Sequence, residues 1–359
     1  MFLIRNAQLD DASSLLKLAR MVHSNNLPDD PELLRAKIIR SRKSFTFVPM
    51  ERQEREFLFV LEDTDTGNVI GSSAVIPAMG GPGKPHLYFQ VRKREFYSED
   101  LQTGQVHVTL QLGQDETGPT EIGGLILAPS YRGHRERLGS QLSLVRFHFI
   151  GLNRALFADR VIAEMMGTLT PDSRNTLWDY LGRRFINLSY TEADTFCRQS
   201  KEFIVSLFPT EEIYASLLPP EARRLIGRVG PETEPAKILL ERMGFRSSGH
   251  VDPFDGGPYL EAKIDDLELV RATRKLRLIE ASGPFDEQGF ISVSENGNFR
   301  AMRSSYGLIG DSIAVPAETM TLLGVKPGAM LGVTPRRPSR AAGPELEAME
   351  SGAVDVAER

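Results

Sequence analysis

Apolar and polar residues alternate along the first third of the chain in a pattern that predicts a largely antiparallel sheet. A short apolar run at 2–5 predicts a strand, and the apolar face that carries Leu15 and Leu18 predicts a helix after it. A second amphipathic helix is expected near 31–42. Two apolar runs then flank the polar turn DTDTGN, which is typical of a β-hairpin. The further expected strands are 57–63, 68–76, 87–97 and 105–112.

The segment 121–150, EIGGLILAPSYRGHRERLGSQLSLVRFHFI, combines an apolar strand, a basic loop and a helix. Ile122–Leu127 is a continuous apolar run, suited to a strand that is buried on both faces, and Pro129 ends it. Apolar residues recur at helical spacing from about Gly139. Free N–H groups and the positive end of the helix dipole make such a helix start an anion site. The alternative is a basic loop that only caps a surface helix.

The second half of the chain continues with strands and helices and then changes character. A strand is expected at 161–167, a helix at 175–185, and a helix, Gly244 and a strand within 235–254. The units WDYLGRRF and LLERMGF share a helix-Gly-x-Phe design, which would fit two related halves. Short strands and a Pro-started helix follow. The expected domains are 1–276, a small β-rich domain at 285–335 and a disordered tail at 336–359.

Charge and cysteine content narrow the classes of function. The 359 residues carry a formal net charge of −5, so the chain as a whole offers no basic face for nucleic acid. The single cysteine, Cys197, excludes an internal disulfide framework and a cysteine-rich metal site and favours the cytoplasm. The histidines lack metal-ligand spacing, so no metal is expected. Neither a signal peptide nor a stretch long enough to span a membrane is predicted.

Characteristic blocks occur along 1–335. They are SLLKLAR, NNLPDDPELLRAKIIRSRKSF, FLFVLED, LAPSYR, DRVIAEMMG, LWDYLGRRF, PPEARRLIGRV, GFRSSGHVDPFDGGPYLEA and NFRAMRSSYGL to GVTP. In order and spacing these blocks resemble the arginine N-succinyltransferase family, and the segment 121–150 resembles in plan the CoA-binding unit of GNAT acyltransferases. The resemblance implies an α+β fold: a GNAT-type mixed, largely antiparallel sheet flanked by helices, with a small C-terminal β-rich domain. It also implies transfer of an acyl group, from succinyl-CoA or another acyl-CoA, to the α-amino group of arginine or a related amine.

The CoA-binding residues follow from this resemblance. Strand amides near Leu125 would pair with the pantetheine arm and leave one amide to polarise the thioester carbonyl. Loop amides, with glycines that permit close approach and arginines that add charge, would hold the diphosphate. The expected residues are Leu125, Ile126, Leu127, Arg132, Gly133, Arg135, Arg137, Leu138, Gly139 and Ser140.

Three positions depart from the family motifs. The family carries a proton-transfer His in IGQVHPHTAPA, whereas this chain reads IGRVGPETEPA and has Gly230 there. Glycine cannot carry a proton, so this role does not transfer. Met166 stands in place of the arginine of EMRG, and Asn25 and Asn26 stand in place of Thr–Ser before Leu-Pro. Met166, Asn25 and Asn26 are therefore candidates for substrate binding.

Three other residues are candidates for the proton acceptor. Glu232 follows Gly230 in the same turn, His250 stands where the family usually has Tyr, and Glu164 lies inside an apolar strand. Each has a structural alternative: a solvated loop Glu, a surface His, and a buried Glu paired with an Arg.

The acidic segment DPFDGGP has two interpretations. Its carboxylates Asp252 and Asp255 can line a pocket for a cationic acceptor, and the same residues fit a turn rich in Asp and Gly.

Three functions remain open at this level. The preferred hypothesis is an active acyl-CoA N-acyltransferase with a small amine acceptor, which forms a homo- or hetero-oligomer and binds neither nucleic acid nor membrane. The second is a non-catalytic or regulatory subunit of a heteromer, because Gly230 removes a key group. The third concerns the tail domain, in which IAVPAETMTLLGVKPGAMLGV resembles swapped-hairpin DNA-binding modules. Its low positive charge argues against DNA contact.

Overall fold

A computed structural model describes residues 1–21, 27–197 and 200–336. The strands in this part of the chain form one mixed sheet in the order β12-β15-β11-β14-β13-β1-β2-β3-β6-β7-β10-β9-β4-β5-β8. Most neighbouring strands are antiparallel, and β6–β7 and β11–β14 are parallel. The α+β fold class expected from the sequence is confirmed. The disordered tail predicted at 336–359 lies, apart from its first residue, outside the described residues.

The bounds of the elements follow chain order. The strands are β1 (Phe2–Asn6), β2 (Phe57–Asp63), β3 (Asn68–Ile76), β4 (His86–Ser98), β5 (Thr103–Asp115), β6 (Thr120–Leu127), β7 (Arg160–Glu164), β8 (Ile213–Tyr214), β9 (Arg246–Val251), β10 (Pro258–Lys263), β11 (Arg274–Leu278), β12 (Glu287–Glu295), β13 (Asn298–Ile309), β14 (Ser312–Ala314) and β15 (Met330–Pro335). The helices are α1 (Ala12–Met21), α2 (Pro31–Phe45), α3 (Leu138–Leu152), α4 (Thr176–Tyr180), α5 (Gly182–Phe185), α6 (Tyr190–Cys197), α7 (Glu202–Leu207), α8 (Pro220–Arg223), α9 (Glu234–Met243), α10 (Glu268–Arg271) and α11 (Ala317–Leu323).

The central strands are covered on both faces. In β2, Phe57 and Phe59 belong to the core beneath α3, whereas Leu58 and Val60 pack with α1 and α2. Successive side chains of a strand point to opposite faces, so a strand between two helical layers is apolar at every position. This explains the continuous apolar run FLFVL, and the predicted hairpin of β2 and β3 is confirmed.

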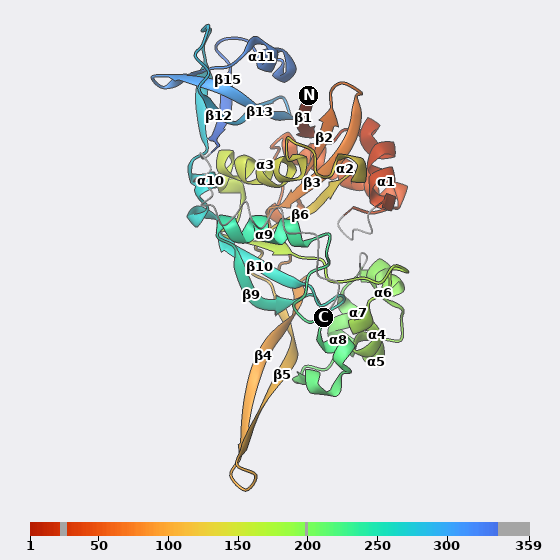
Figure 1. Cartoon of the computed structure of the whole chain (residues 1–359). Helices are drawn as coiled ribbons and strands as arrows, with labels where there is room; N and C mark the ends of the chain where they lie inside the picture. Colours follow the sequence, from red (N-terminus) through yellow and green to blue (C-terminus); the bar gives the residue numbers. More distant parts are fainter. Residues whose placement is uncertain (22–26, 198–199, 337–359) are drawn as a thin grey trace, which may run out of the picture.

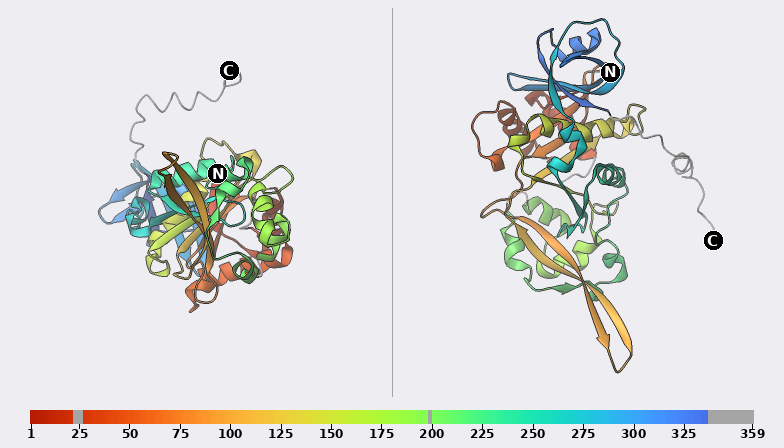
Figure 2. Two further views of the ribbon diagram at one scale, coloured as in Figure 1. Left: turned by 90° about the horizontal axis from the view of Figure 1, so that it is seen from below. Right: turned by 90° about the vertical axis from the view of Figure 1, so that its left-hand side faces the viewer.

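Two structures extend from this body at opposite ends (Figures 1 and 2). The β4–β5 hairpin is a long two-stranded arm, and strands β11–β15 with α11 form an appendage. The two strands of the arm extend slightly beyond the predicted ranges of 87–97 and 105–112, and the outer half of the arm is largely exposed.

The second half of the chain corrects two predicted elements. The strand predicted at 161–167 ends at Glu164, because the chain turns away from the sheet there. The helix predicted at 175–185 is divided into α4 and α5, where Gly182 packs against the Trp178 ring too closely for any Cβ. The predicted domain boundary at 276 falls inside β11, which pairs with β14 and β15 of the appendage.

A buried histidine joins α3 to the appendage. His148 is fully buried, and its ring nitrogens lie 2.5 Å from Thr334 Oγ1 on β15 and 2.6 Å from Ser292 Oγ on β12. Burial lowers the pKa of His148 to about 3, so the ring is neutral at ordinary pH. One face of the appendage is thereby tied to the central helix by a neutral hydrogen-bond network.

This network predicts a loss of stability in acid. An unfolded His binds a proton below about pH 6.5, whereas the native ring binds one only near pH 3, so the free energy of unfolding falls as the pH drops through this window. From pH 7 to pH 5, His148 accounts for roughly 2 kcal/mol of that loss. Urea titrations should therefore show a shallower decline for His148→Gln than for wild type. His107→Gln, on the arm, is the control and should keep the wild-type slope.

Candidate functional site

The parallel strands β6 and β7 lie together at one end and separate at the other. Their register pairs Thr120 with Val161 and Glu121 with Ile162, and no pair follows. Beyond these residues β6 stays with β3 and β7 stays with β10. On this side, the backbone groups of β6 after Glu121 thus have no neighbouring strand in the part of the chain that the structure describes. The region where β6 and β7 diverge is called the opening, and the end at which the two strands still pair is its closed end.

A β-bulge lies on β6 within this opening. The register with β3 shifts between Ser72 and Ala74, opposite Gly124, whose φ of +58° is the left-handed conformation that favours glycine. The Gly124 carbonyl accepts a hydrogen bond from Ser72 Oγ at 3.1 Å. Gly123 and Leu125, on either side of the bulge, are partly exposed. An extended ligand placed here has strand backbone to pair with, as expected for the pantetheine arm.

The loop after β6 ends at the start of α3, as the sequence predicts. Arg137 takes a left-handed conformation with φ of +52°, and its carbonyl accepts the first bond of the helix from Gln141 N. The N–H groups of Leu138, Gly139 and Ser140 therefore have no partner within the helix. A Cβ on Gly139 would make only an ordinary contact at 3.8 Å, so packing does not require glycine there. This helix start has the donors and the dipole that an anion needs.

Buried carboxylates gather on the other face of the sheet, at the closed end of the opening. Ile122, Val161 and Ala163 pack under α3, so the alternating residues Glu121 and Glu164 point away from that helix. Glu121 is buried, and its Oε2 has no hydrogen-bond partner among the described residues. The Glu164 side chain is 24% exposed.

His86 is a further member of this cluster. Its Nδ1 lies 3.4 Å from Glu164 Oε1, although neither ring nitrogen makes a hydrogen bond within the described part of the chain. Burial, and then the charge of Lys201, lower the pKa of His86 to about 3. A neutral imidazole therefore faces the carboxylate.

Burial and mutual repulsion shift the titration of the whole cluster. Burial and then the Glu164 charge raise the pKa of Glu121 to about 8. Burial raises the pKa of Glu164 as well, against the opposing charge of Lys201, and burial and Glu164 raise that of Asp252. Burial alone would lower the pKa of Lys201, but Glu164, Cys197 and Asp252 raise it. The cluster thus holds more acidic groups than cations, and Glu121 in particular retains a proton near neutral pH.

The two aspartates of DPFDGGP have different partners. Asp255 accepts from the backbone N–H groups of Gly167 at 2.8 Å and Gly257 at 2.7 Å, which fixes the turn against the end of β7. Asp252 Oδ1 accepts from two amides of its own turn, while Oδ2 accepts from Tyr259 Oη at 3.2 Å. Asp255 is thus bound within the turn, and Asp252 faces the carboxylate cluster.

Two departures from the family motifs meet in space. Gly230 N donates to the carbonyl of Met166 at 2.9 Å, just beyond β7, and α9 begins four residues later. Both residues therefore lie beside the end of the strand that carries Glu164. Asn25 and Asn26, the other predicted substrate-binding positions, lie outside the described residues.

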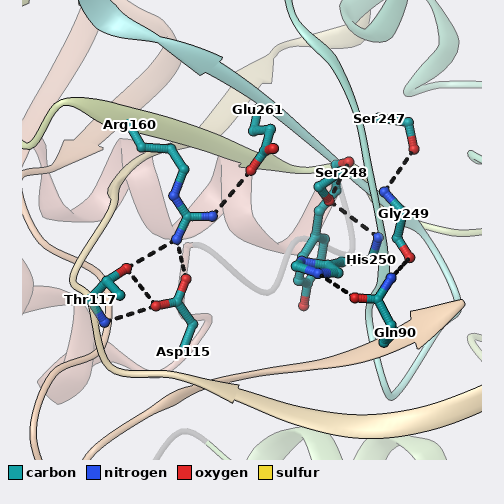
Figure 3. Close-up of polar contacts among 10 residues, drawn as sticks. Gln90, Asp115, Thr117, Arg160, Ser247, Ser248, Gly249, His250 and Glu261 are labelled. Carbon is teal, nitrogen blue, oxygen red and sulfur yellow. Dashed lines mark hydrogen bonds and ion pairs between the residues drawn. The ribbon is translucent and has the colours of Figure 1, made fainter.

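The other two candidate acceptors lie apart from this cluster. Glu232 is exposed and pairs with Arg132 of the loop, with Oε2 and a guanidinium nitrogen 3.1 Å apart. His250 stacks on Tyr88 at 3.8 Å between ring centroids, and its Nε2 lies 3.1 Å from Gln90 Oε1 (Figure 3). Burial lowers the pKa of His250, and the charges that act on it come from Glu261, Arg160 and Asp115. The proton roles assigned to Glu232 and His250 stay predictions.

The sequence did not predict that Glu121, His86, Lys201 and Tyr259 belong to one cluster. Glu121 carried a usable signal, because it opens a strand that is otherwise apolar and its carboxylate must be buried with that strand. His86, Lys201 and Tyr259 carried none, since long stretches of chain separate them from Glu121.

Metal and membrane features are both missing from the described residues. No group of three or more His, Cys, Asp or Glu there is arranged to hold a metal ion. No helix in residues 1–21, 27–197 and 200–336 has the length and apolar character of a membrane span.

Known proteins resemble the chain over most of its length. The family model "Arginine N-succinyltransferase beta subunit" matches residues 2–269. The arginine N-succinyltransferase of Citrobacter koseri is 36% identical over 307 residues, which cover 84% of this chain and 88% of that protein. That of Shigella dysenteriae is 37% identical over 292 residues, covering 80% and 83%.

A solved structure agrees with this likeness in sequence. The arginine/ornithine succinyltransferase subunit AI of Pseudomonas aeruginosa superposes with a TM-score of 0.78 at 27% identity, covering 93% of this chain and 98% of that one. The separation of β6 from β7 and the N–H groups at the start of α3 that have no partner within the helix are compatible with this likeness, and the comparisons show that the chain belongs to the arginine N-succinyltransferase family of acyl-CoA N-acyltransferases.

Proposed function

We propose that this chain transfers a succinyl group from succinyl-CoA to the α-amino group of arginine or a related amine, by direct attack in a ternary complex. The observation that carries the proposal is the opening between β6 and β7, with buried carboxylates at its closed end. Strand backbone for a thioester arm and an acidic cluster for a cationic amine thus meet at one point. A non-catalytic subunit would need no such junction.

The donor side of the site suits an acyl-CoA. Exposed arginines of the loop and the free N–H groups at the start of α3 suit a diphosphate, and the partly exposed backbone around Leu125 suits the pantetheine arm. The Leu125 amide, beside the bulge, is our candidate for polarising the thioester carbonyl. These assignments rest on the strand, loop and helix 121–150.

The acceptor side suits a cation. Glu121, Glu164 and Asp252 are acids whose raised pKa values mean that burial without a sufficient countercharge penalises their ionised forms. A bound guanidinium or ammonium group would favour ionisation and offer N–H donors to the partnerless oxygen of Glu121. Arginine carries both the cation and the α-amino group that is acylated.

Glu164 is our candidate for the proton acceptor. If the register continued beyond Ile162, Glu164 would lie opposite Gly123 in the opening, and its side chain is partly exposed. The amine nitrogen bonds to the thioester carbon, the C–S bond breaks, and CoA leaves as the thiolate. The proton lost by nitrogen passes to the Glu164 carboxylate, which then releases it to solvent, and the thiolate takes up a proton from solvent. A carboxyl group with a raised pKa is a better base near neutral pH than an ordinary one.

The first test is thiol release. Purified protein is mixed with succinyl-CoA or acetyl-CoA, with and without arginine, ornithine and a panel of other amines. Release that needs both succinyl-CoA and arginine is the expected outcome, confirmed by mass spectrometry of succinylarginine. CoA binding without thiol release for any amine would overturn the proposal in favour of a non-catalytic subunit.

Substitution of the rival acids should identify the proton acceptor. Glu164→Gln keeps the shape of the side chain and removes the base, so kcat should fall at least tenfold, with little change in CoA affinity. In wild type, kcat should rise with pH as the carboxyl groups of the cluster ionise. This rise should be smaller in Glu164→Gln. Glu232→Gln, in the exposed loop, is expected to keep kcat within a factor of about two. If kcat fell tenfold in Glu232→Gln while Glu164→Gln stayed active, Glu232 and not Glu164 would be the proton acceptor.

The packing of the backbone around residue 230 requires a glycine at this position. A Cβ at this position would lie 2.9 Å from the carbonyl oxygen of Gly167, closer than side chains tolerate, so residues with a Cβ must displace backbone. Gly230→Ala should lower the free energy of unfolding by roughly 1–3 kcal/mol, measured by urea denaturation. Gly230→His should be destabilised too, without a gain in turnover.

The matched control for this prediction is Gly104→Ala on the arm. A Cβ there would meet its nearest atom at 3.5 Å, an ordinary contact, so stability should stay at or slightly above the wild-type value. A Gly230→His protein that was as stable as wild type and turned over faster would contradict the prediction.

The predicted oligomer also stays a proposal. The arm exposes apolar side chains at its outer end, and an isolated two-stranded ribbon gains little stability by itself. The residues concerned are Phe96, Tyr97, Leu101 and Val106. These features support burial of the arm against another subunit.

A further inference from the structure

Arg146 is a buried cation in the middle of α3. Only 3% of the residue is exposed, and its guanidinium bonds to neutral oxygens. Nε donates to Ser143 O at 3.0 Å, one terminal nitrogen donates to Ser143 Oγ at 2.6 Å, and the other donates to Gly123 O at 3.4 Å. Five N–H groups are available, so the fork retains donors for a further partner.

No carboxylate of a described residue pairs with this guanidinium. Burial alone lowers the pKa of Arg146 to about 9. Arg5, a partly buried arginine, has acidic partners in Asp11 and Glu62. Burying an unpaired charge is costly, and a ligand that supplies the opposite charge would offset this cost.

Arg55 shows what a structural arginine of this kind looks like. It is also buried and donates to the carbonyl oxygens of Ser44, at 3.4 Å, and Val48, at 2.7 Å. These carbonyls lie at and just beyond the C-terminal end of α2, where the helix dipole supplies negative potential. Arg146 lies in the interior of α3 and has no such compensation.

The position of Arg146 relates it to the donor strand. Arg146 contacts the carbonyl oxygen of Gly123. Gly123 is partly exposed, and it lies two residues beyond the last pair of β6 with β7, next to the bulge. Because α3 covers one face of β6 and the acidic residues Glu121 and Glu164 point to the other, Arg146 and the acidic cluster lie on opposite sides of the opening.

We infer that Arg146 binds the distal carboxylate of a dicarboxylic acyl group, and so selects succinyl-CoA over acyl-CoA donors with a neutral chain. The inference rests on the proposed function, because it assigns the acyl group to the opening beside Gly123. Two methylene groups separate the thioester carbonyl of a succinyl group from its carboxylate, so the carboxylate extends away from the reacting carbon. The acidic face repels it, and the guanidinium on the α3 face attracts it with charge-assisted hydrogen bonds.

The experiment compares succinyl-CoA with butyryl-CoA, which has the same number of acyl carbons and no carboxylate. In Arg146→Met, the ratio of kcat/KM for succinyl-CoA to that for butyryl-CoA should fall at least tenfold, because only succinyl-CoA loses a partner. Dissociation constants measured by calorimetry without acceptor should change in the same direction, with succinyl-CoA weakened and butyryl-CoA nearly unchanged. Arg146→Lys keeps a charge without the planar fork and should give an intermediate ratio.

Arg55→Met is the matched control, since it removes another buried arginine and leaves the opening untouched. It should lower stability and keep the wild-type ratio. A wild-type ratio in folded Arg146→Met would overturn the inference, and if that variant does not fold, the same ratio in Arg146→Lys decides. Failure of the proposed function looks different: wild type would release no thiol, and the two dissociation constants would still test Arg146.

Discussion

Two backbone pairs hold the parallel strands β6 and β7 together, and the site depends on their separation immediately afterwards. A complete parallel ladder would satisfy the N–H and C=O groups of both strands and leave no place for a ligand. Because the pairing stops at Glu121 and Ile162, the backbone around Gly124 and Leu125 faces an opening. The bulge at Gly124 and the start of α3 follow in chain order, and the proposed function assigns the first to the thioester arm and the second to the diphosphate.

The same strands separate the charges of the site. Alternation of side chains along β6 and β7 directs Val161 and Ala163 into the core under α3, and directs Glu121 and Glu164 to the opposite face. Arg146 reaches β6 from α3, on the first of these faces. Under the proposed function, a cationic acceptor and an anionic acyl chain would therefore have separate surroundings at one reaction centre, and neither would have to be stabilised in the charge field of the other.

Two of the departures from the family motifs, Gly230 and Met166, form one local feature. Gly230 bonds to the Met166 backbone and approaches Gly167 too closely for a side chain, so the turn before α9 is packed against the end of β7. Asp255 fixes the other side of the same strand end through the Gly167 amide. A tight turn at this point places backbone, rather than a side chain of residue 230, beside the end of β7. Under the proposed function, proton transfer is assigned instead to Glu164, whose pKa is raised by burial.

The amino-acid sequence by itself determined the elements whose partners lie nearby in the chain. The apolar run at 57–63, the hairpin with 68–76 and the strand, loop and helix of 121–150 follow from side-chain period, turn residues and helix starts, which are local properties. The sequence also indicated Glu164, because a carboxylate within an apolar strand is buried with it. Only the tertiary structure decided which charges meet. Glu121, His86, Lys201 and Asp252 come together through strand order, and their pKa values depend on burial and on neighbours distant in the chain, which no local pattern encodes.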